Sequence, residues 1–356
     1  MSRFILQKDI RGAVMQFARL GNTGLAVSRL AFGNMTFGTD SRFPSVAKVD
    51  LDTARAMIHR AFDAGVNFFD TADGYSNGEA EKYLGEFLGE KRKEVVVATK
   101  CGFRSGKPIT QAGLSRRHIF EGCHSSLKKL NTDWIDLYIV HKVDPFTPVE
   151  ETLEALNDLV HSGKVRYIGF SNWPAWKAAT ALTLQRERGW AQFTSGQMYY
   201  SLLARDLEHE FVPFLRATGT GMTVWSPLSS GFLSGKYTRE SFDDKENRLS
   251  GFSFLPLDKD LGFRLIEEMR QIAKPHGATV AQIALAWLLA KPYVTSVIMG
   301  ASKMHQLEDN LKSVEAQLRE AELAKLDEIT APRTQYPNWF TEMTLDPEHK
   351  QALRPA

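Results

Sequence analysis

Polar side chains that can donate, accept or hold a proton stand at the ends of three successive apolar runs of the sequence. Asp70 and Tyr75 lie in FFDTADGY (68–75), Lys100 ends VVATK, and His141 follows YIV. Each of them alone has an ordinary structural interpretation, such as a turn-forming aspartate or a surface tyrosine. Together, a carboxylate, a phenol, an ammonium group and an imidazole are side chains of general acid–base chemistry.

The chain around these residues repeats one pattern, a short β-rich apolar run followed by a turn and a stretch with helical periodicity. The predicted strands are LAFGNM (30–35), VNFFDT (66–71), EVVVATK (94–100), WIDLYIV (134–140), KVRYIGF (164–170), QFTSGQM (192–198), GMTVWS (221–226) and TSVIMG (295–300). The predicted helices cover about 52–64, 79–90, 115–130, 148–162, 174–188, 207–219, 278–290 and a stretch after 303.

Eight strand–helix units without a Gly/Pro/Ser-rich linker predict one α/β domain over 1–356, a (β/α)8 TIM barrel. A doubly wound sheet is the alternative, but no G-x-G-x-x-G motif follows a predicted strand. Active sites of (β/α)8 barrels lie at the carboxyl ends of the strands. The barrel would therefore bring Asp70, Tyr75, Lys100 and His141 to one mouth.

Four segments fall outside the repeat. Phe17–Ser28 is predicted to be a β-hairpin that could close the bottom of the barrel. Ser229–Phe263, after the seventh strand, is too long for an ordinary connection and is predicted to be a long functional loop. Residues 1–16 are interpreted as an N-terminal extension and 331–356 as a C-terminal tail.

Several predicted helices carry start signals. Thr147-Pro148-Val149-Glu150 combines a capping box with proline at the first helical position. Ser115 and Ser302 each stand where an N-cap is expected.

Charge and composition exclude several classes of protein. The 356 residues include 44 Lys and Arg and 42 Asp and Glu, a formal net charge of +2, which indicates neither nucleic acid nor a membrane surface as a partner. No apolar run approaches the ~18–20 residues of a membrane-spanning helix. Two cysteines are too few for a disulfide framework, and charged residues interrupt the apolar start of the chain. We expect a cytoplasmic protein without a metal site.

Blocks of the sequence resemble those of the aldo-keto reductase superfamily, in the same order, over nearly the whole chain. They are FFDTADGYSNGEAEKYLG, VATKCG, IDLYIVHKVDP, VRYIGFSNW, VWSPLSSGFLSGKY and MGASKMHQLEDN. Within the superfamily, LSRRHIFEG, TPVEET and SPLSSGFLSGKY look closest to the potassium-channel β-subunit-like branch and its bacterial relatives. The resemblance implies an NADP-dependent oxidoreductase that reduces aldehydes or ketones to alcohols by hydride transfer.

By this resemblance Asp70, Tyr75, Lys100 and His141 form a catalytic tetrad. Tyr75 would act as general acid, although a free phenol has a pKa of about 10 and is a sluggish acid at neutral pH. We expect the Lys100 cation to lower that pKa and Asp70 to hold Lys100 charged and in place. His141 would orient the carbonyl oxygen and stabilise its developing charge.

The resemblance also implies NADP(H) as the cofactor, bound against the later strands. The loop after the seventh strand would cover the pyrophosphate. The helix after the eighth strand would receive the 2′-phosphate near Ser302 and Lys303, where a helix N-terminus favours anions. The predicted cofactor-binding residues are Asn34, Asp70, Ser171, Asn172, Gln197, Trp225, Ser226, Pro227, Leu228, Lys236, Arg248, Gly300, Ser302, Lys303, Gln306, Asp309 and Asn310.

Two other functions remain compatible with the sequence. One is an NAD(P)-dependent dehydrogenase of sugars or other alcohols, and the other is a nucleotide-sensing regulatory subunit that resembles channel β-subunits. His141 favours turnover over sensing, because the similar mammalian subunits carry Asn at that place. The sequence leaves open the physiological substrate, the preferred direction, the oligomeric state and the role of both termini.

Overall fold

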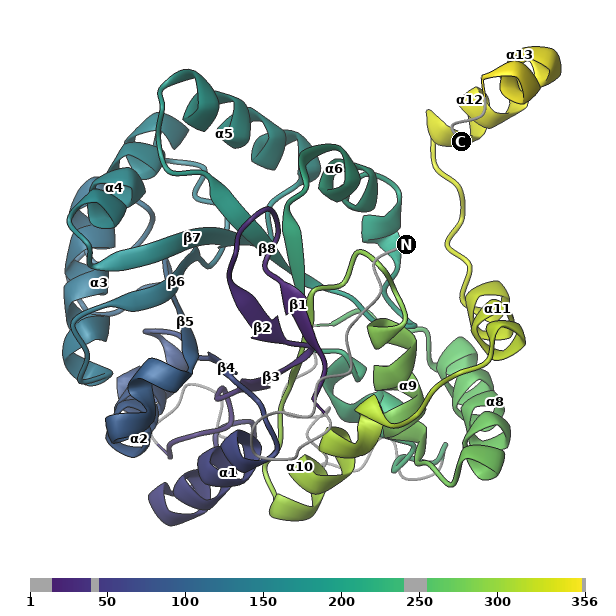
Figure 1. Cartoon of the computed structure of the whole chain (residues 1–356), viewed down its shortest axis with the longest axis horizontal. Helices are drawn as coiled ribbons and strands as arrows, with labels where there is room; N and C mark the ends of the chain where they lie inside the picture. The colour runs from purple at the N-terminus through teal and green to yellow at the C-terminus, as the bar shows by residue number, and fades with distance from the viewer. Residues whose placement is uncertain (1–14, 40–44, 240–254, 354–356) are drawn as a thin grey trace.

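The predicted barrel is present in the structure, a computed structural model that describes residues 15–39, 45–239 and 255–353. Eight parallel strands close on themselves in the order β10-β3-β4-β5-β6-β7-β8-β9 (Figure 1). They are β3 (Leu30–Gly33), β4 (Phe68–Asp70), β5 (Val96–Cys101), β6 (Ile135–Val140), β7 (Val165–Ser171), β8 (Phe193–Tyr199), β9 (Gly221–Trp225) and β10 (Ser296–Met299).

A ring of helices covers the outside of these strands (Figure 1). The α-helices of the described residues are α1 (Leu51–Asp63), α2 (Glu79–Leu88), α3 (Arg116–Lys129), α4 (Val149–His161), α5 (Ala175–Glu187), α6 (Phe211–Thr218), α8 (Lys259–His276), α9 (Val280–Leu289), α10 (Met304–Leu311), α11 (Glu320–Ile329), α12 (Asn338–Thr344) and α13 (Pro347–Ala352). Apolar residues at helical spacing give the helices of the ring one apolar face, which packs against the strands. In α1 this buried face is formed by Ala54, Met57, Ile58, Ala61 and Phe62. In the tail, α12 and α13 lie outside this ring.

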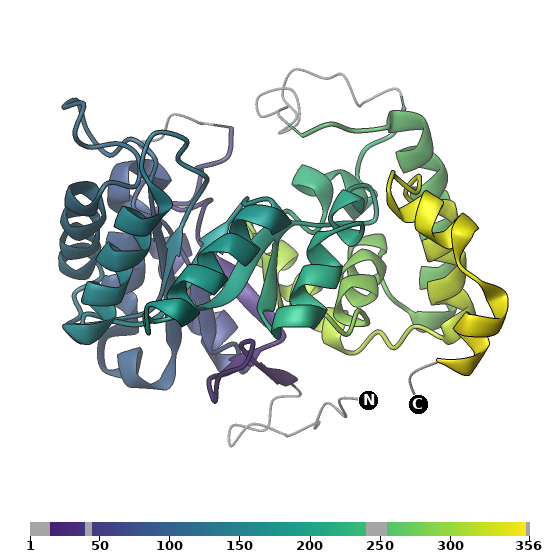
Figure 2. The ribbon, with the colours of Figure 1, turned by 90° about the horizontal axis from the view of Figure 1, so that it is seen from above.

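The predicted hairpin closes one end of the barrel. Strand β1 (Phe17–Arg19) pairs antiparallel with β2 (Ala26–Ser28). Leu20 and Val27 are fully buried in one apolar cluster with strand residues such as Phe68 and Leu137, so the hairpin plugs the barrel interior. Figure 2 shows the hairpin at one end and the loops that follow the carboxyl ends of the strands at the other.

The seam at which the last strand meets the first depends on Arg29. Its side chain is 1% exposed, and its guanidinium donates to the carbonyl oxygens of Val294 and Leu289, and to that of Thr295 at 3.2 Å. The backbone N–H of Val297 donates to the Arg29 carbonyl at 2.8 Å. Burial lowers the pKa of Arg29 to about 10. Arg29 therefore connects the start of β3 to β10, to the loop that precedes β10 and to the end of α9.

One of the predicted helix starts is confirmed and two are wrong. The hydroxyl of Ser115 accepts from the His118 N–H and caps α3. No capping box forms at Thr147, because its hydroxyl donates to Asp144 Oδ2 at 2.7 Å and Pro148 takes the N-cap position. Ser302 is not an N-cap either.

Helix α10 begins two residues after Ser302, with Lys303 at its N-cap. The N–H and the hydroxyl of Ser302 both donate to Gln306 Oε1, at 3.0 and 3.2 Å. The serine is therefore engaged by a side chain of the helix and does not cap it.

The long loop predicted over Ser229–Phe263 is shorter than the sequence suggests. A 3₁₀ segment covers Ser229–Ser234, and α8 begins at Lys259 with Asp258 as its N-cap. Residues 240–254 lie outside the described residues, and so does Arg248. Helix α8 was not predicted, although its buried residues Leu265, Ile266, Met269, Ile272 and Ala273 have helical spacing.

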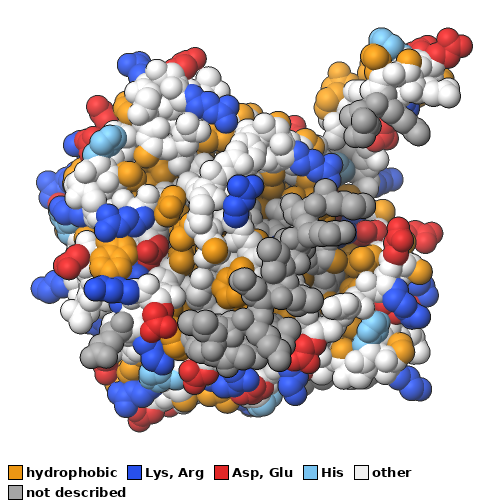
Figure 3. Space-filling view, viewed as in Figure 1, with side chains coloured by type: hydrophobic (Ala, Val, Ile, Leu, Met, Phe, Trp, Pro, Cys, Tyr) orange, Lys and Arg blue, Asp and Glu red, His pale blue; other side chains and the backbone are white. Residues whose placement is uncertain are grey.

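The surface carries both signs of charge. Figure 3 shows the face of the molecule on which the hairpin lies. Among its described residues, Lys and Arg are interspersed with Asp and Glu around the rim. Within the described ranges, no helix is long and apolar enough to cross a membrane. The described residues also include no group of three or more His, Cys, Asp or Glu placed to hold a metal ion. Cys101 and Cys123 are buried and free.

Candidate active site

The carboxyl ends of the eight strands bring the predicted site residues together, because parallel strands of a closed barrel all end at the same face. The register places Asp70 beside Gly33 and Ser171 beside Gln197 on neighbouring strands. Each strand from β3 to β10 has a predicted site residue within two positions of its carboxyl end: Asn34, Asp70, Lys100, His141, Ser171, Gln197, Trp225 and Gly300.

Lys100 lies one residue before the end of β5 and is fully buried. Its Nζ is 2.6 Å from Asp70 Oδ1, 2.8 Å from the Thr71 carbonyl oxygen and 3.3 Å from the Tyr75 hydroxyl. The second oxygen of Asp70 accepts from Gln197 Nε2 at 2.8 Å. The ammonium group thus has three fixed partners, and the carboxylate is held from both sides.

The same contacts set the protonation of the tetrad. Burial lowers the pKa of Lys100, but the charge of Asp70 and the nearby Tyr75 outweigh it, so the net pKa is raised. Burial raises the pKa of Tyr75, and the opposing effect of Lys100 is smaller. Lys100 lowers the pKa of Tyr75, as the sequence predicts, but desolvation is the larger effect and leaves the net pKa raised. Tyr75 stays protonated and Lys100 stays charged at neutral pH.

His141 faces the phenol across the mouth. Its backbone N–H donates to the Cys101 carbonyl at 2.8 Å, and its ring centroid is 5.9 Å from that of Tyr75. Phe103 packs edge-on against the imidazole at 4.7 Å. Burial, with the charges of Lys100 and Lys142, lowers the pKa of His141 well below its usual range. The imidazole is therefore neutral and can donate a hydrogen bond from only one of its two nitrogens.

The ends of β7, β8 and β9 form a connected group of polar side chains. Asn172, at a φ of 58°, donates to the His141 carbonyl at 3.0 Å and accepts from Trp225 Nε1 at 3.0 Å. The hydroxyl of Ser171 donates to the Gln197 carbonyl at 2.8 Å. The Trp225 ring stacks on Tyr199 with centroids 4.9 Å apart. This wall presents fixed amides and a flat aromatic surface beside the tetrad.

Asn34 provides a test of whether a nicotinamide nucleotide suits this face. It follows β3 beside Asp70, whose carbonyl accepts the Asn34 N–H at 2.9 Å. The residue is fully buried, and neither polar atom of its side chain has a partner among the described residues. A buried amide without partners is costly. The residues at this mouth therefore fit a ligand with hydrogen-bonding groups of its own, such as a nicotinamide nucleotide.

The loop after β9 begins with a tightly folded backbone. Ser226 has a φ of 52°, and its hydroxyl accepts from the Ser230 N–H at 2.9 Å. Pro227 follows, and the Leu228 carbonyl accepts the N–H groups of Gly231 and Leu233. Lys236 is exposed, with its Nζ 4.7 Å from the Tyr237 ring centroid.

Most of the predicted cofactor-binding residues after β10 have hydrogen-bond partners within the protein. Asn310 is 4% exposed and donates to the Gly300 carbonyl at 3.2 Å. Asp309 accepts from Thr279 and Gln282, which form the capping box of α9. Lys303 is exposed at the start of α10. Asp309 and Asn310 therefore position α10 and its preceding loop, and Lys303 is the accessible cation there.

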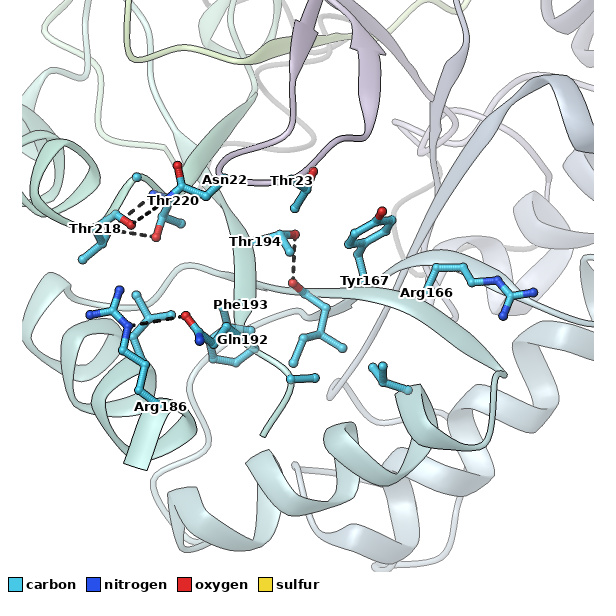
Figure 4. A pocket seen from close by; sticks show the side chains of 15 residues that line it. Asn22, Thr23, Arg166, Tyr167, Arg186, Gln192, Phe193, Thr194, Thr218 and Thr220 are labelled. Carbon is cyan, nitrogen blue, oxygen red and sulfur yellow. Dashed lines mark hydrogen bonds between the residues drawn. The ribbon is translucent and has the colours of Figure 1, made fainter. Parts of the chain in front are cut away.

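A cavity of about 350 Å³ lies at the opposite end of the barrel (Figure 4). Arg166, Arg186 and Thr218 are among its lining residues, and Thr218 is hydrogen-bonded to Thr220 at 2.8 Å. None of the predicted site residues lines it. The amino ends of β7, β8 and β9 line this cavity. In (β/α)8 barrels the residues at this end contribute to stability, and the active site lies at the other end.

Sequence reasoning missed some residues of the site. Tyr199 stacks on Trp225, and the Thr71 carbonyl holds Lys100. Tyr199 ends β8, so its position alone could have indicated it. A backbone carbonyl leaves no signal in the sequence.

The sequence model of the Aldo/keto reductase family matches residues 29–331, which contain all the predicted site residues. The chain belongs to the aldo/keto reductase family. Members of this family are oxidoreductases that use a nicotinamide cofactor, so the chain is an oxidoreductase of that kind.

Individual relatives agree with the predicted branch. The chain is 38% identical over 309 residues to a probable voltage-gated potassium channel subunit beta of Oryza sativa subsp. japonica, covering 85% of this chain and 92% of the relative. It is 32% identical to versiconal hemiacetal acetate reductase of Aspergillus parasiticus, over 91% of this chain and 99% of that one. An uncharacterized oxidoreductase of Bacillus subtilis is 36% identical, over 88% and 96%. The predicted resemblance is confirmed.

Proposed function

We propose that this aldo/keto reductase uses NADPH to reduce small aldehydes or ketones to alcohols. The observation that carries the proposal is the position of Lys100 Nζ, 2.6 Å from Asp70 and 3.3 Å from the Tyr75 hydroxyl. A buried cation held against a protonated phenol supports proton donation by that phenol, because the ammonium group stabilises the anion left behind.

The side chains divide the work of the reaction. The reduced nicotinamide, when bound, supplies a hydride to the carbonyl carbon. Tyr75 donates its proton to the carbonyl oxygen, and Lys100 stabilises the resulting phenolate. His141, neutral because of its lowered pKa, donates an N–H to the same oxygen and orients it. Asp70 keeps Lys100 charged and in place.

The residues proposed to bind the cofactor lie on the same face of the barrel as the tetrad. The nicotinamide carboxamide would bind Ser171, Asn172 and Gln197, beside the unpartnered amide of Asn34. The exposed Lys303 at the start of α10 favours the 2′-phosphate of NADPH, because a cation and a helix N-terminus both stabilise an anion. Trp225, Ser226, Pro227, Leu228, Lys236 and Gly300 would lie along the rest of the nucleotide.

A substrate screen tests the proposal. Purified protein is mixed with NADPH or NADH and a set of aldehydes and ketones, and the loss of reduced-nicotinamide absorbance is followed. We expect turnover with several carbonyl compounds and a preference for NADPH. Turnover with NADH alone on sugars or polyols would support the dehydrogenase alternative. Tight NADPH binding without turnover of any substrate would support a nucleotide-sensing role.

A further inference from the structure

Asp73 is a buried acidic residue to which the proposed reaction assigns no part. It lies in the turn that joins Asp70 to Tyr75, is 4% exposed, and its N–H donates to the Lys100 carbonyl at 3.1 Å. Among the described residues, neither carboxylate oxygen has a hydrogen bond of ordinary geometry, although the Gly74 amide lies close enough to favour the charged form. A buried carboxylate without partners is costly and calls for an explanation.

The neighbours of Asp73 form a buried polar cluster, made of side chains from α2, α3, β5 and β6. Glu81 is fully buried; its Oε1 accepts from the Thr99 hydroxyl at 2.6 Å and its Oε2 is 3.4 Å from Lys129 Nζ. The backbone of α3 comes close at Gly122, where a β-carbon would lie 3.9 Å from Asp73 Oδ2 and 3.1 Å from the Tyr138 hydroxyl. The titratable groups that interact electrostatically with Asp73 are Tyr75, Glu81, Lys100, Cys101, Lys129 and Tyr138.

The charges of this buried cluster do not balance without a proton. Lys100 and Asp70 neutralise each other, which leaves Asp73 and Glu81 with Lys129 alone. Glu81 has both an ion pair with Lys129 and a hydrogen bond from Thr99. Asp73 has neither, and it is therefore the group that a proton would neutralise.

We propose that Asp73 is a positioning residue of the site, a buried carboxyl group that holds a proton and whose ionisation sets how firmly Tyr75 holds its own. Burial, with the charge of Glu81, raises the pKa of Asp73 to about 7. The charge of ionised Asp73 in turn raises the pKa of Tyr75. Ionisation near neutral pH would therefore keep the general acid protonated in more alkaline solution. The effect of Asp73 on proton donation by Tyr75 rests on the proposed function.

The first test observes the proton directly in the cofactor-free protein. Infrared difference spectra of wild type between pH 5.5 and 8.5 should show a protonated-carboxyl band that is lost with a midpoint near pH 7. The band should be absent from Asp73→Asn and retained in Asp133→Asn, which removes an exposed carboxylate near the start of β6. If Asp73→Asn does not fold, the wild-type titration decides. A wild-type spectrum without such a transition, or a band that persists in Asp73→Asn, overturns the proposal.

The second test follows the alkaline limb of kcat/KM for carbonyl reduction. Asp73→Asn removes a negative charge near Tyr75, so activity should fall at lower pH than in wild type, whereas Asp133→Asn should leave the limb in place. An unchanged limb in Asp73→Asn contradicts the link to Tyr75. If no carbonyl compound is reduced at all, the proposed function fails, while the infrared titration still reports on Asp73.

Discussion

Tyr75 is the residue on which the proposed chemistry depends most directly. Its hydroxyl is 3.3 Å from Lys100 Nζ and its ring faces His141, so removing the hydroxyl takes away the proton without changing either neighbour. We expect Tyr75→Phe to lower kcat by at least about 100-fold, the usual range for general acid catalysis, and to leave NADPH affinity nearly unchanged. Stopped-flow turnover and fluorescence titration of NADPH measure the two effects.

Tyr83→Phe, a partly buried tyrosine on α2, is the matched control and should retain activity. A Tyr75→Phe variant that keeps most of its kcat would show that another group donates the proton.

His141 predicts a pH dependence of stability. Its pKa in the folded protein is well below the usual 6.5, which applies to the unfolded chain. Below pH 6.5 the unfolded chain therefore binds a proton that the folded protein does not, and stability falls as the pH drops through that value. In His141→Gln the loss of stability between pH 7 and pH 5, measured as the shift of the urea midpoint, should be smaller than in wild type.

The exposed His305→Gln should show the wild-type dependence. Equal midpoint shifts in wild type and His141→Gln would mean that His141 takes up its proton while the protein is folded.

At the scale of elements, the proposed preference for NADPH depends on the first turn of α10. Lys303 is exposed at the N-cap, and the loop before it is held by Asn310 and Gln306, so a cation stands on a rigid helix start. A charge-assisted contact with the 2′-phosphate contributes roughly 1.5–3 kcal/mol, about ten- to a hundred-fold in affinity. Lys303→Ala should weaken NADPH binding by that factor and leave NADH binding almost unchanged in fluorescence titrations.

Lys312→Ala, an exposed lysine just after the other end of α10, controls for the general loss of a positive charge. Equal losses of NADPH and NADH affinity in Lys303→Ala would remove this lysine from the 2′-phosphate site.

At the scale of the whole molecule, closure of the barrel depends on the contact between β3 and β10. Substitution of one side chain, Arg29, should weaken this contact. Arg29→Met leaves the buried carbonyls of Val294 and Thr295 and the partly buried carbonyl of Leu289 without this donor, and one unsatisfied buried group costs ~1–3 kcal/mol. We expect a loss of about 2 kcal/mol or more in the free energy of unfolding, seen as a lower urea midpoint.

Arg19→Met, at an exposed position on β1, should change the midpoint little. A midpoint for Arg29→Met equal to that of wild type would show that water satisfies these carbonyls.

The sequence by itself determined the barrel and the face on which the site lies. Alternation of apolar runs and helical stretches predicts eight βα units, and parallel strands place Asp70, Lys100 and His141 at one mouth whatever their distance along the chain. These features follow from local periodicity and from one topological rule, so they need no knowledge of individual contacts.

Only the tertiary structure decided the protonation of these residues and the partners of their neighbours. Whether the pKa of Tyr75 is raised or lowered depends on the balance of its burial against the charge of Lys100. Neither the burial of Tyr75 nor its distance from Lys100 can be read from the sequence. The engagement of Asp309 by the start of α9 and the isolation of Asp73 are contacts between distant segments. Desolvation and long-range hydrogen bonds arise only when separate elements pack, which is why local patterns do not carry them.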